Sequence, residues 1–355
     1  MFSYLLLGGY DTDQGSLAMS FPDGLEESLF SHYKACKLCP RRCGVDRAGG
    51  QMGFCGERAH MRIAAIEAHL GEEPPISGNN GSGTVFFSGC SLRCPFCQNY
   101  QISQDGVGRE WSLQEVVDRL AALHEHGGIH NVNFVTPDHF LPHTVAIVNL
   151  LRERAIPIPV VYNVSGYQRV ESLRLIGSFA DVYLPDFKYG DVALAQALSG
   201  TPDYAKVALE AVAEMVRQKG FLDAFANADY SAFTAGGMDD TSPLAQSGVL
   251  VRHLILPGHV GNSIQALTML FLEFGGELPI SLMSQYLPLR QFPPGSPLNR
   301  MVTPEEFQEV LGHARELGFM NLFVQPPEDD ASEMWSFLPD FRSIHPFPGN
   351  TRRLT

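Results

Sequence analysis

Residues 84–324 alternate short apolar segments, typical of buried strands, with longer amphipathic segments, typical of helices. Ser112 with Glu115 forms a capping box, and Thr303 with Pro304 gives a second helix-start signal. Repeated β–α alternation predicts a parallel sheet, and six or seven units indicate a full or partial TIM-type barrel. The expected strands are 85–88, 131–136, 160–165, 181–188, 249–256, 280–286 and 321–324, and the helices between them include 141–154, 168–176, 191–199, 203–219 and 263–274.

Three cysteines directly follow the first of these strands, in the spacing Cys-x3-Cys-x2-Cys: Cys90, Cys94 and Cys97. Cysteine thiolates hold iron–sulfur clusters. Three thiolates on a four-iron cluster leave one iron open, which is what a metal centre keeps when it must bind a substrate or cofactor. A structural zinc site or an incidental loop is the alternative.

The other four cysteines form an earlier set with the spacing Cys-x2-Cys-x3-Cys-x11-Cys: Cys36, Cys39, Cys43 and Cys55. Pro40 and nearby glycines supply the sharp turns that bring ligands together. Four thiolates predict a closed site for either zinc or a second iron–sulfur cluster, and redox-active free thiols are the third possibility. Seven cysteines in two short-spaced sets argue against a disulfide scaffold and predict a reducing compartment, the cytoplasm.

Composition and charge argue against several other classes of protein. The chain has 355 residues and a net charge of −14, and an acidic chain is a poor nucleic-acid binder by default. No apolar run approaches the ~20 residues of a membrane span. Residues 5–7 are leucines without a basic region before them, so we expect neither a signal peptide nor a membrane anchor.

We expect three parts: an N-terminal extension with the four-cysteine metal site (1–80), a barrel (81–326) and a tail on the surface (327–355). Within them, 25–33 predicts a helix, 62–83 reads as a Pro/Gly linker, and 221–247 reads as an inserted surface loop. Glu72 and Glu73 are expected to be solvated loop charges, with a role in a site as the alternative.

Polar residues interrupt the ends of several apolar strands, where the site of a barrel lies. They are Asn163, Ser165, Asp186, Lys188, Arg252, His253, Ser284, Gln285 and Tyr286. Buried charges are costly unless paired or used, so these positions predict either a polar cofactor above the sheet or an internal ion-pair network. Of the histidines near strand and helix ends, His139 is a candidate to face the site, although a solvated or core position is the simpler expectation.

The loop at Cys90, Cys94 and Cys97, with the aromatic Phe96 before its third cysteine, resembles the radical SAM signature. The resemblance implies that the open iron binds S-adenosylmethionine (SAM) and that the reduced 4Fe-4S cluster cleaves it to a 5′-deoxyadenosyl radical. It also implies which side chains contact SAM. Arg252 suits the carboxylate, Asp186 the amino group, and Asn163 and Ser165 the ribose, with Phe96 and Lys188 completing the cofactor site.

From about residue 81 to 286 the chain is similar to the activating enzymes of glycyl radical enzymes, the pyruvate formate-lyase activating enzyme type. The similarity lies in three motifs: Asn163-Val164-Ser165-Gly166, Asp186-Phe187-Lys188, and Val251-Arg252-His253 with Leu256-Pro257-Gly258. Cys39-Pro40-Arg41 and residues 71–75 resemble a branch that carries an additional N-terminal four-cysteine cluster. Two departures stand out: Asn133 to Pro137 replaces the Gly-Gly-Glu segment that holds the SAM amino group in many relatives, and Asn163 replaces an aspartate that ligates a cation.

The sequence therefore predicts a partial TIM-type (β/α)6 radical SAM barrel and an enzyme that abstracts hydrogen from its substrate. The resemblance implies a glycyl radical enzyme as protein substrate and flavodoxin or ferredoxin as electron donor. Another protein, a peptide or a small molecule is the alternative substrate. Two hypotheses from other classes are a non-enzymatic electron carrier with two clusters and a zinc-ordered protein-interaction module.

Overall fold

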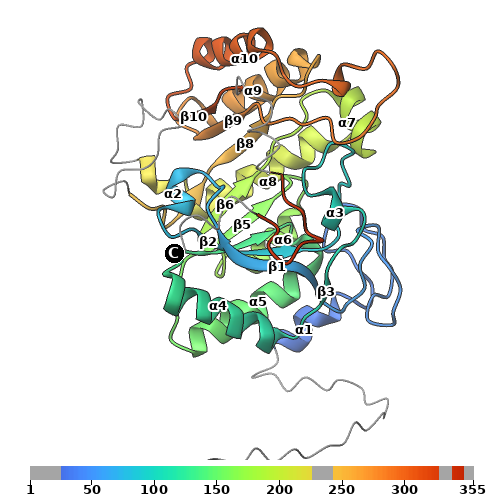
Figure 1. The fold of residues 1–355 in the computed structure, drawn as a ribbon, viewed down its shortest axis with the longest axis vertical. Helices are drawn as coiled ribbons and strands as arrows, with labels where there is room; N and C mark the ends of the chain where they lie inside the picture. The colour runs from blue at the N-terminus through green and yellow to red at the C-terminus, as the bar shows by residue number, and fades with distance from the viewer. Residues whose placement is uncertain (1–24, 226–242, 328–337, 348–355) are drawn as a thin grey trace, which may run out of the picture.

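The computed structural model describes residues 25–225, 243–327 and 338–347, and within them the backbone forms one curved layer of mainly parallel strands covered by helices (Figure 1). One sheet has the order β3-β1-β2-β4-β5-β6-β7 and the other β10-β9-β8. The parallel strands are β2 (Ser82–Phe87), β4 (Val132–Val135), β5 (Val160–Val164), β6 (Val182–Pro185), β7 (Gly248–Val249), β8 (Val251–Leu254), β9 (Ile280–Met283) and β10 (Leu322–Gln325).

The two sheets meet between β6 and β8. Asp186 and Arg252 form a parallel bridge, and the backbone nitrogen of Phe187 donates to the carbonyl of Arg252 at 2.7 Å. The strands from β2 to β10 thus follow one another in an arc whose ends do not pair among the described residues. The predicted partial TIM-type barrel is confirmed, and it is open rather than closed.

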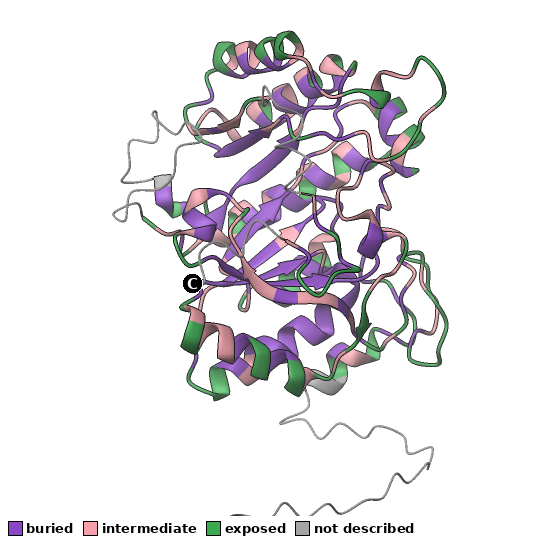
Figure 2. Cartoon of the chain, viewed as in Figure 1, coloured by how far each residue is buried: buried purple, intermediate pink, exposed green. Residues whose placement is uncertain are grey.

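The helices lie between successive strands, as the alternation predicts. They are α4 (Leu113–Gly127), α5 (Leu141–Glu153), α6 (Val170–Ile176), α7 (Val192–Ser199), α8 (Tyr204–Lys219), α9 (Val260–Phe274) and α10 (Pro304–Leu317). Ser112 forms the expected capping box with Glu115, and Thr303, the expected cap of its helix, also forms a capping box with Glu306. Figure 2 shows the central parallel strands almost wholly buried and most of the helices exposed along their outer faces. No helix in the described ranges is long and apolar enough to cross a membrane.

The segment before β2 differs from the expected linker. After α1 (Leu25–Ser31), the chain forms β1 (Arg62–His69). This strand pairs antiparallel with β2 on one side and with the short β3 (Arg109–Glu110) on the other. A register shift between Ile63 and Ala65 lets Ile63 and Ile66, three residues apart, both be buried. This bulge breaks the two-residue period of a strand, which is why the sequence pattern did not reveal it. Two short helices complete this part: α2 (Pro74–Ser77) and α3 (Tyr100–Ser103).

Segments from outside the barrel fill its inner face. Ile76 of α2 joins Leu222 and Ala245, from the two described ends of the predicted insertion, in a cluster with inward residues of β5, β6 and β10. These ends are therefore buried rather than on the surface, while the middle of that insertion lies outside the described residues. Phe341 of the C-terminal part is buried against Phe86 at 5.2 Å between ring centroids, so this part of the predicted surface tail packs inward.

Candidate functional site

The three-cysteine loop, residues 89–99, leaves the carboxyl end of β2. It begins at Gly89, whose φ is +83°, and a Cβ there would lie 2.8 Å from the carbonyl oxygen of Cys55. Only glycine meets both demands without strain. Cys90 and Cys94 are buried, and Cys97 is half-buried. The chain thus turns sharply out of the sheet and places three thiols on one short loop.

The three thiols lie close enough to affect one another. Burial raises the pKa of Cys90 to about 12, and the neighbouring Cys94 and Cys97 raise it further. Burial likewise raises the pKa of Cys97. A buried thiol gives up its proton readily only when a metal takes its place. The donor set therefore fits a group that binds three thiolates together.

Each sulfur of the loop accepts a hydrogen bond. Ser199 at the end of α7 donates to Cys94 at 3.2 Å, Ser103 of α3 donates to Cys97 at 3.4 Å, and the backbone nitrogen of Leu92 lies 3.4 Å from Cys90 Sγ. Such donors stabilise a metal-bound thiolate from outside the metal's own ligands. Ser199 and Ser103 were missed by the sequence analysis. Ser199 is 105 residues from Cys94, so no local pattern connects the two.

Phe96 is buried between two tyrosines. Its ring centroid lies 6.3 Å from that of Tyr189 and 6.3 Å from that of Tyr286. Tyr189 in turn hydrogen-bonds Ser199, the donor to Cys94, at 2.7 Å. The aromatic residue noted in the sequence therefore packs the loop against the ends of β6 and β9.

In the four-cysteine segment, residues 32–58, two of the four thiols lie next to Gly53. A Cβ on Gly53 would be 3.3 Å from the sulfur of Cys55 and 3.5 Å from that of Cys43. Burial raises the pKa of Cys39 to about 12, with Cys55 and Cys36 adding to it. Cys43 is exposed and the other three are buried. No three His, Cys, Asp or Glu side chains of the described ranges are arranged around a single metal ion.

Arg47 is buried beside this set. Its side chain is 1% exposed, and Nη1 lies 3.8 Å from the sulfur of Cys36. The guanidinium also donates to the carbonyls of Arg58 and His139 and stacks over Tyr33 at 4.5 Å. No carboxylate in the described part of the chain forms an ion pair with it. A buried cation needs a compensating negative charge, and metal-bound thiolates would supply one, so the segment fits a thiolate-ligated metal.

The four-cysteine segment contacts the three-cysteine loop directly. The backbone nitrogen of Cys90 donates to the carbonyl of Cys55 at 3.2 Å. Arg41 donates to the carbonyl of Ser91 at 2.9 Å and to that of Ser199 at 2.6 Å. A cysteine of one set is therefore hydrogen-bonded through its backbone to a cysteine of the other.

Asp186 and Lys188 form an ion pair of 2.5 Å at the end of β6. Burial lowers the pKa of Lys188, but Asp186 and Cys94 outweigh it and hold that pKa above its usual value. Lys188 is therefore positively charged and lies near the three-cysteine loop. The structure brings these two predicted residues together.

Arg252 of β8 binds Glu72 and Glu73 of the segment between β1 and α2. Its Nε donates to Glu73 at 2.9 and 3.1 Å, and Nη2 contacts both carboxylates. The three side chains are only 10%, 7% and 2% exposed. The expectation of solvated loop charges is wrong for both glutamates, because a partner 179 residues away in the chain draws them inside.

Glu72 also collects two asparagines. Its second oxygen accepts from Asn133 of β4 at 2.8 Å and from Asn163 of β5 at 3.2 Å. Burial raises the pKa of Glu72, but Arg252 outweighs it and lowers that pKa below its usual value. The internal ion-pair network, one of the two accounts of these buried charges, is therefore present. Ser165 is not part of this network, and its hydroxyl accepts from Gln168 Nε2 at 3.4 Å.

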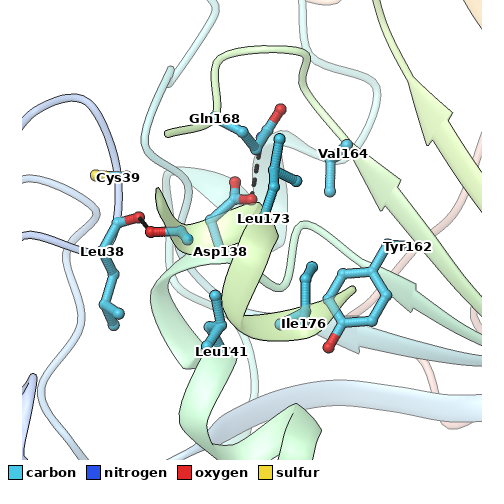
Figure 3. Close-up of a pocket in the computed structure, with 10 residues that line it drawn as sticks. Leu38, Cys39, Asp138, Leu141, Tyr162, Val164, Gln168, Leu173 and Ile176 are labelled. Carbon is cyan, nitrogen blue, oxygen red and sulfur yellow. Dashed lines mark hydrogen bonds between the residues drawn. The ribbon is translucent and has the colours of Figure 1, made fainter. Parts of the chain in front are cut away.

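A small cavity of about 10 Å³ lies behind Cys39, between α6 and β5 (Figure 3). Asp138 is buried there, accepts from Gln168 at 3.0 Å, and has one oxygen without a partner. Burial raises its pKa to about 7. The neighbouring His139 is a core residue: it contacts the carbonyl of Ser88 at 2.6 Å, and burial lowers its pKa to about 3.

Comparison with known proteins gives one family match and several distant structural likenesses. Residues 84–227 match the model of the radical SAM superfamily. The "Uncharacterized protein MJ0674" of Methanocaldococcus jannaschii is 28% identical over 284 residues, which cover 79% of this chain and 74% of that protein.

Among solved structures, SuiB of Streptococcus suis has a TM-score of 0.43 at 8% identity and HydG, a maturase of the [FeFe]-hydrogenase, 0.44 at 13%. The alignments cover 72% and 70% of this chain but about half of each of those chains (49% and 51%). Methylornithine synthase (PylB) has a TM-score of 0.38 at 13% identity, covering 89% of this chain and 82% of that one. Because the family match spans β2, the three-cysteine loop and the strands through β6, this chain contains a radical SAM superfamily domain.

Proposed function

We propose that this protein is a radical SAM enzyme that abstracts a hydrogen atom from its substrate. The observation that carries the proposal is the three-cysteine loop at the end of β2, with its buried thiols and its serine donors, inside the matched domain. In this proposal Cys90, Cys94 and Cys97 hold a 4Fe-4S cluster. When bound, the cluster and SAM supply the hydrogen-abstracting radical.

In this proposal the protein holds the cluster, orients SAM and keeps water from the three-cysteine loop. Ser199 and Ser103 donate to the thiolates, and Phe96 with its two tyrosines keeps water from the loop. For SAM we propose Asp186 at the amino group and Asn163, Ser165 and Lys188 at the remaining polar groups. The contacts of Arg252 to the glutamates use Nε and Nη2, so we propose that a cofactor carboxylate meets Nη1.

For the substrate, we propose a glycyl radical enzyme, with flavodoxin or ferredoxin as the electron donor. The support is the set of sequence motifs shared with the activating enzymes, above all Asp186-Phe187-Lys188 at the end of β6. The four-cysteine segment is proposed to bind zinc or a second cluster, and the seven unpaired cysteines favour the cytoplasm.

The test is SAM cleavage by anaerobically reconstituted protein. We expect 5′-deoxyadenosine after reduction with dithionite from the wild type, and at least a ~100-fold loss in Cys94→Ala, because a missing ligand removes the cluster or misplaces it. Ser178→Ala, at an exposed serine in the turn after α6, is the control and should match the wild type.

A protein with a loaded cluster, no SAM binding and no 5′-deoxyadenosine would contradict the proposal and favour the electron-carrier hypothesis. Zinc at both cysteine sets, with no visible absorption, would favour the interaction module instead.

A further inference from the structure

The exposed charged side chains of the four-cysteine segment, called its basic face below, are all basic, although the whole chain carries a net charge of −14. Lys34, Lys37, Arg42 and Arg58 are exposed on it. The acidic residues of the same segment are withdrawn: Glu57 is buried and paired with Arg62 at 2.5 Å, and Asp46 is half-buried. The segment therefore presents positive charge on an otherwise acidic protein.

Two large apolar side chains of the same segment are exposed as well. Met52 is 55% exposed and Phe54 is 44% exposed, and the guanidinium of Arg41 stacks over the Phe54 ring at 4.0 Å. An apolar centre with a charged rim is the usual composition of a protein-docking surface. Cys43, the exposed member of the four-cysteine set, belongs to the same stretch.

A short path leads from this face to the three-cysteine loop. Cys43 and Cys55 lie on either side of Gly53, and the carbonyl of Cys55 accepts from the backbone nitrogen of Cys90. Arg41, which lies over Phe54 on the outside, also binds the carbonyl of Ser91 on the inside. The segment thus connects solvent with a loop whose own thiols are largely buried.

We propose that the four-cysteine segment is the entry point for electrons: its basic face docks an acidic one-electron donor protein, and its four cysteines hold an iron–sulfur cluster. One electron leaves the donor, which is oxidised by one equivalent. It reduces the cluster of the four-cysteine set and then the cluster at Cys90, Cys94 and Cys97. No bond is made or broken, and no proton is moved. This proposal rests on the proposed function, which places a reducible cluster on the three-cysteine loop.

The connection between the sets decides between the two metals in this proposal. Zinc has no redox chemistry, so a zinc site could not pass an electron to the other set. The rate of electron transfer falls steeply with the distance between two centres, so a relay requires the two cysteine sets to lie close together. The buried guanidinium of Arg47, 3.8 Å from Cys36, also stabilises the extra negative charge that a cluster gains on reduction.

The first experiment is metal analysis of anaerobically purified, full-length protein. We expect about eight irons per chain, as two 4Fe-4S clusters require, and no stoichiometric zinc. Two overlapping signals should appear by electron paramagnetic resonance after reduction. About four irons with one zinc per chain would overturn the proposal.

The second experiment measures electron transfer from fully reduced flavodoxin without SAM, and it follows the absorbance of the flavin semiquinone that forms when the flavin loses one electron. Arg42→Glu should slow the reaction about three- to tenfold at low salt, because a rim charge mainly affects association. The difference should vanish near ~1 M salt, where the Debye length is about 3 Å. Arg315→Glu, an exposed arginine on α10 at the far end of the molecule (Figure 1), is the matched control and should leave the rate unchanged.

Equal rates for the two variants, or a difference independent of salt, would overturn the docking surface. So would tighter binding of a labelled oligonucleotide than of flavodoxin. The readout is independent of SAM cleavage, so it separates two failures. Absence of 5′-deoxyadenosine with dithionite refutes the proposed function, whereas normal cleavage with dithionite and no dependence on Arg42 refutes only the entry site.

Discussion

Three charged side chains are buried together where β8 faces the segment between β1 and α2. Arg252 is held by Glu72 and Glu73, and Glu72 is held in turn by Asn133 and Asn163. A buried ion pair is often no more stabilising than a well-packed apolar group, but removing one partner leaves an uncompensated charge. The network therefore fixes the position of the glutamate segment across the sheet more than it adds to the free energy of unfolding.

We predict that Arg252→Met lowers the free energy of unfolding by about 3–5 kcal/mol at pH 7, because both glutamates remain buried without their cation. In the wild type the pKa of Glu72 is lowered, so its stabilising effect is present above the unfolded value of about 4.3 and is lost as pH falls. In the variant, burial alone acts and raises that pKa, so the variant gains stability as pH falls. Chemical denaturation at pH 7 and pH 4.5 should show a smaller difference at the lower pH.

The control for this prediction is Arg315→Met, which removes an exposed arginine and should change the free energy of unfolding by less than about 0.5 kcal/mol. A difference between Arg252→Met and wild type that is the same at both pH values would contradict the assignment of charge to Glu72.

At the scale of elements, the turn from β2 into the three-cysteine loop depends on one glycine that has two constraints. Gly89 has φ +83° and no room for a Cβ, because Cys55 and Glu57 approach it. Gly275, after α9, has φ +77° and nothing within 4 Å. The two positions share a positive φ, and they differ in the space that surrounds them.

We predict that Gly89→Ala destabilises the protein by about 2–4 kcal/mol and Gly275→Ala by only about 1 kcal/mol, because the second change carries the backbone strain alone. Gly89→Ala should also bind less iron at the three-cysteine loop, since relief of the clash must separate it from Cys55. Thermal unfolding and iron analysis of both variants check this. Equal losses would show that the contact with Cys55 does not matter.

Elements with a local signal were predictable, and those that depend on distant partners were not. The capping boxes at Ser112 and Thr303 and the alternating apolar segments gave the helices and parallel strands in their order, although the strand expected at 249–256 is two short strands, β7 and β8, and the one expected at 181–188 spans only 182–185. The two cysteine sets were visible by spacing. In contrast, β1 was hidden by its bulge, the burial of Glu72 depends on Arg252, and the contact of Ser199 with Cys94 has no trace in local sequence. The cofactor roles of Asn163, Asp186 and Arg252 stay predictions.

For the whole molecule, the described part of the C-terminal tail returns to the beginning of the barrel. The backbone nitrogen of Phe341 donates to Gln101 of α3 at 2.6 Å, and Gln101 donates to Asp340 at 3.1 Å. The Phe341 ring packs on Phe86 of β2. The tail thus braces the strand and the short helix on either side of the three-cysteine loop.

We predict that Phe341→Ala costs about 2–4 kcal/mol of stability and speeds hydrogen exchange in residues 100–103, because the aromatic contact with β2 is lost. Ile344→Ala is the control in the same segment, since Ile344 is 91% exposed, and should change neither quantity. Exchange measured by mass spectrometry would contradict the bracing role if α3 were equally protected in both variants.

The hydrogen bond between Cys90 and Cys55 has a consequence for how the protein matures. During synthesis the four-cysteine segment leaves the ribosome before the three-cysteine loop does. In the proposed holoenzyme, metal insertion at the first set would order the carbonyl against which the second loop folds. Assembly would then be sequential, with the N-terminal site acting as the template for the catalytic one, so that iron starvation would deplete both centres together rather than one at a time.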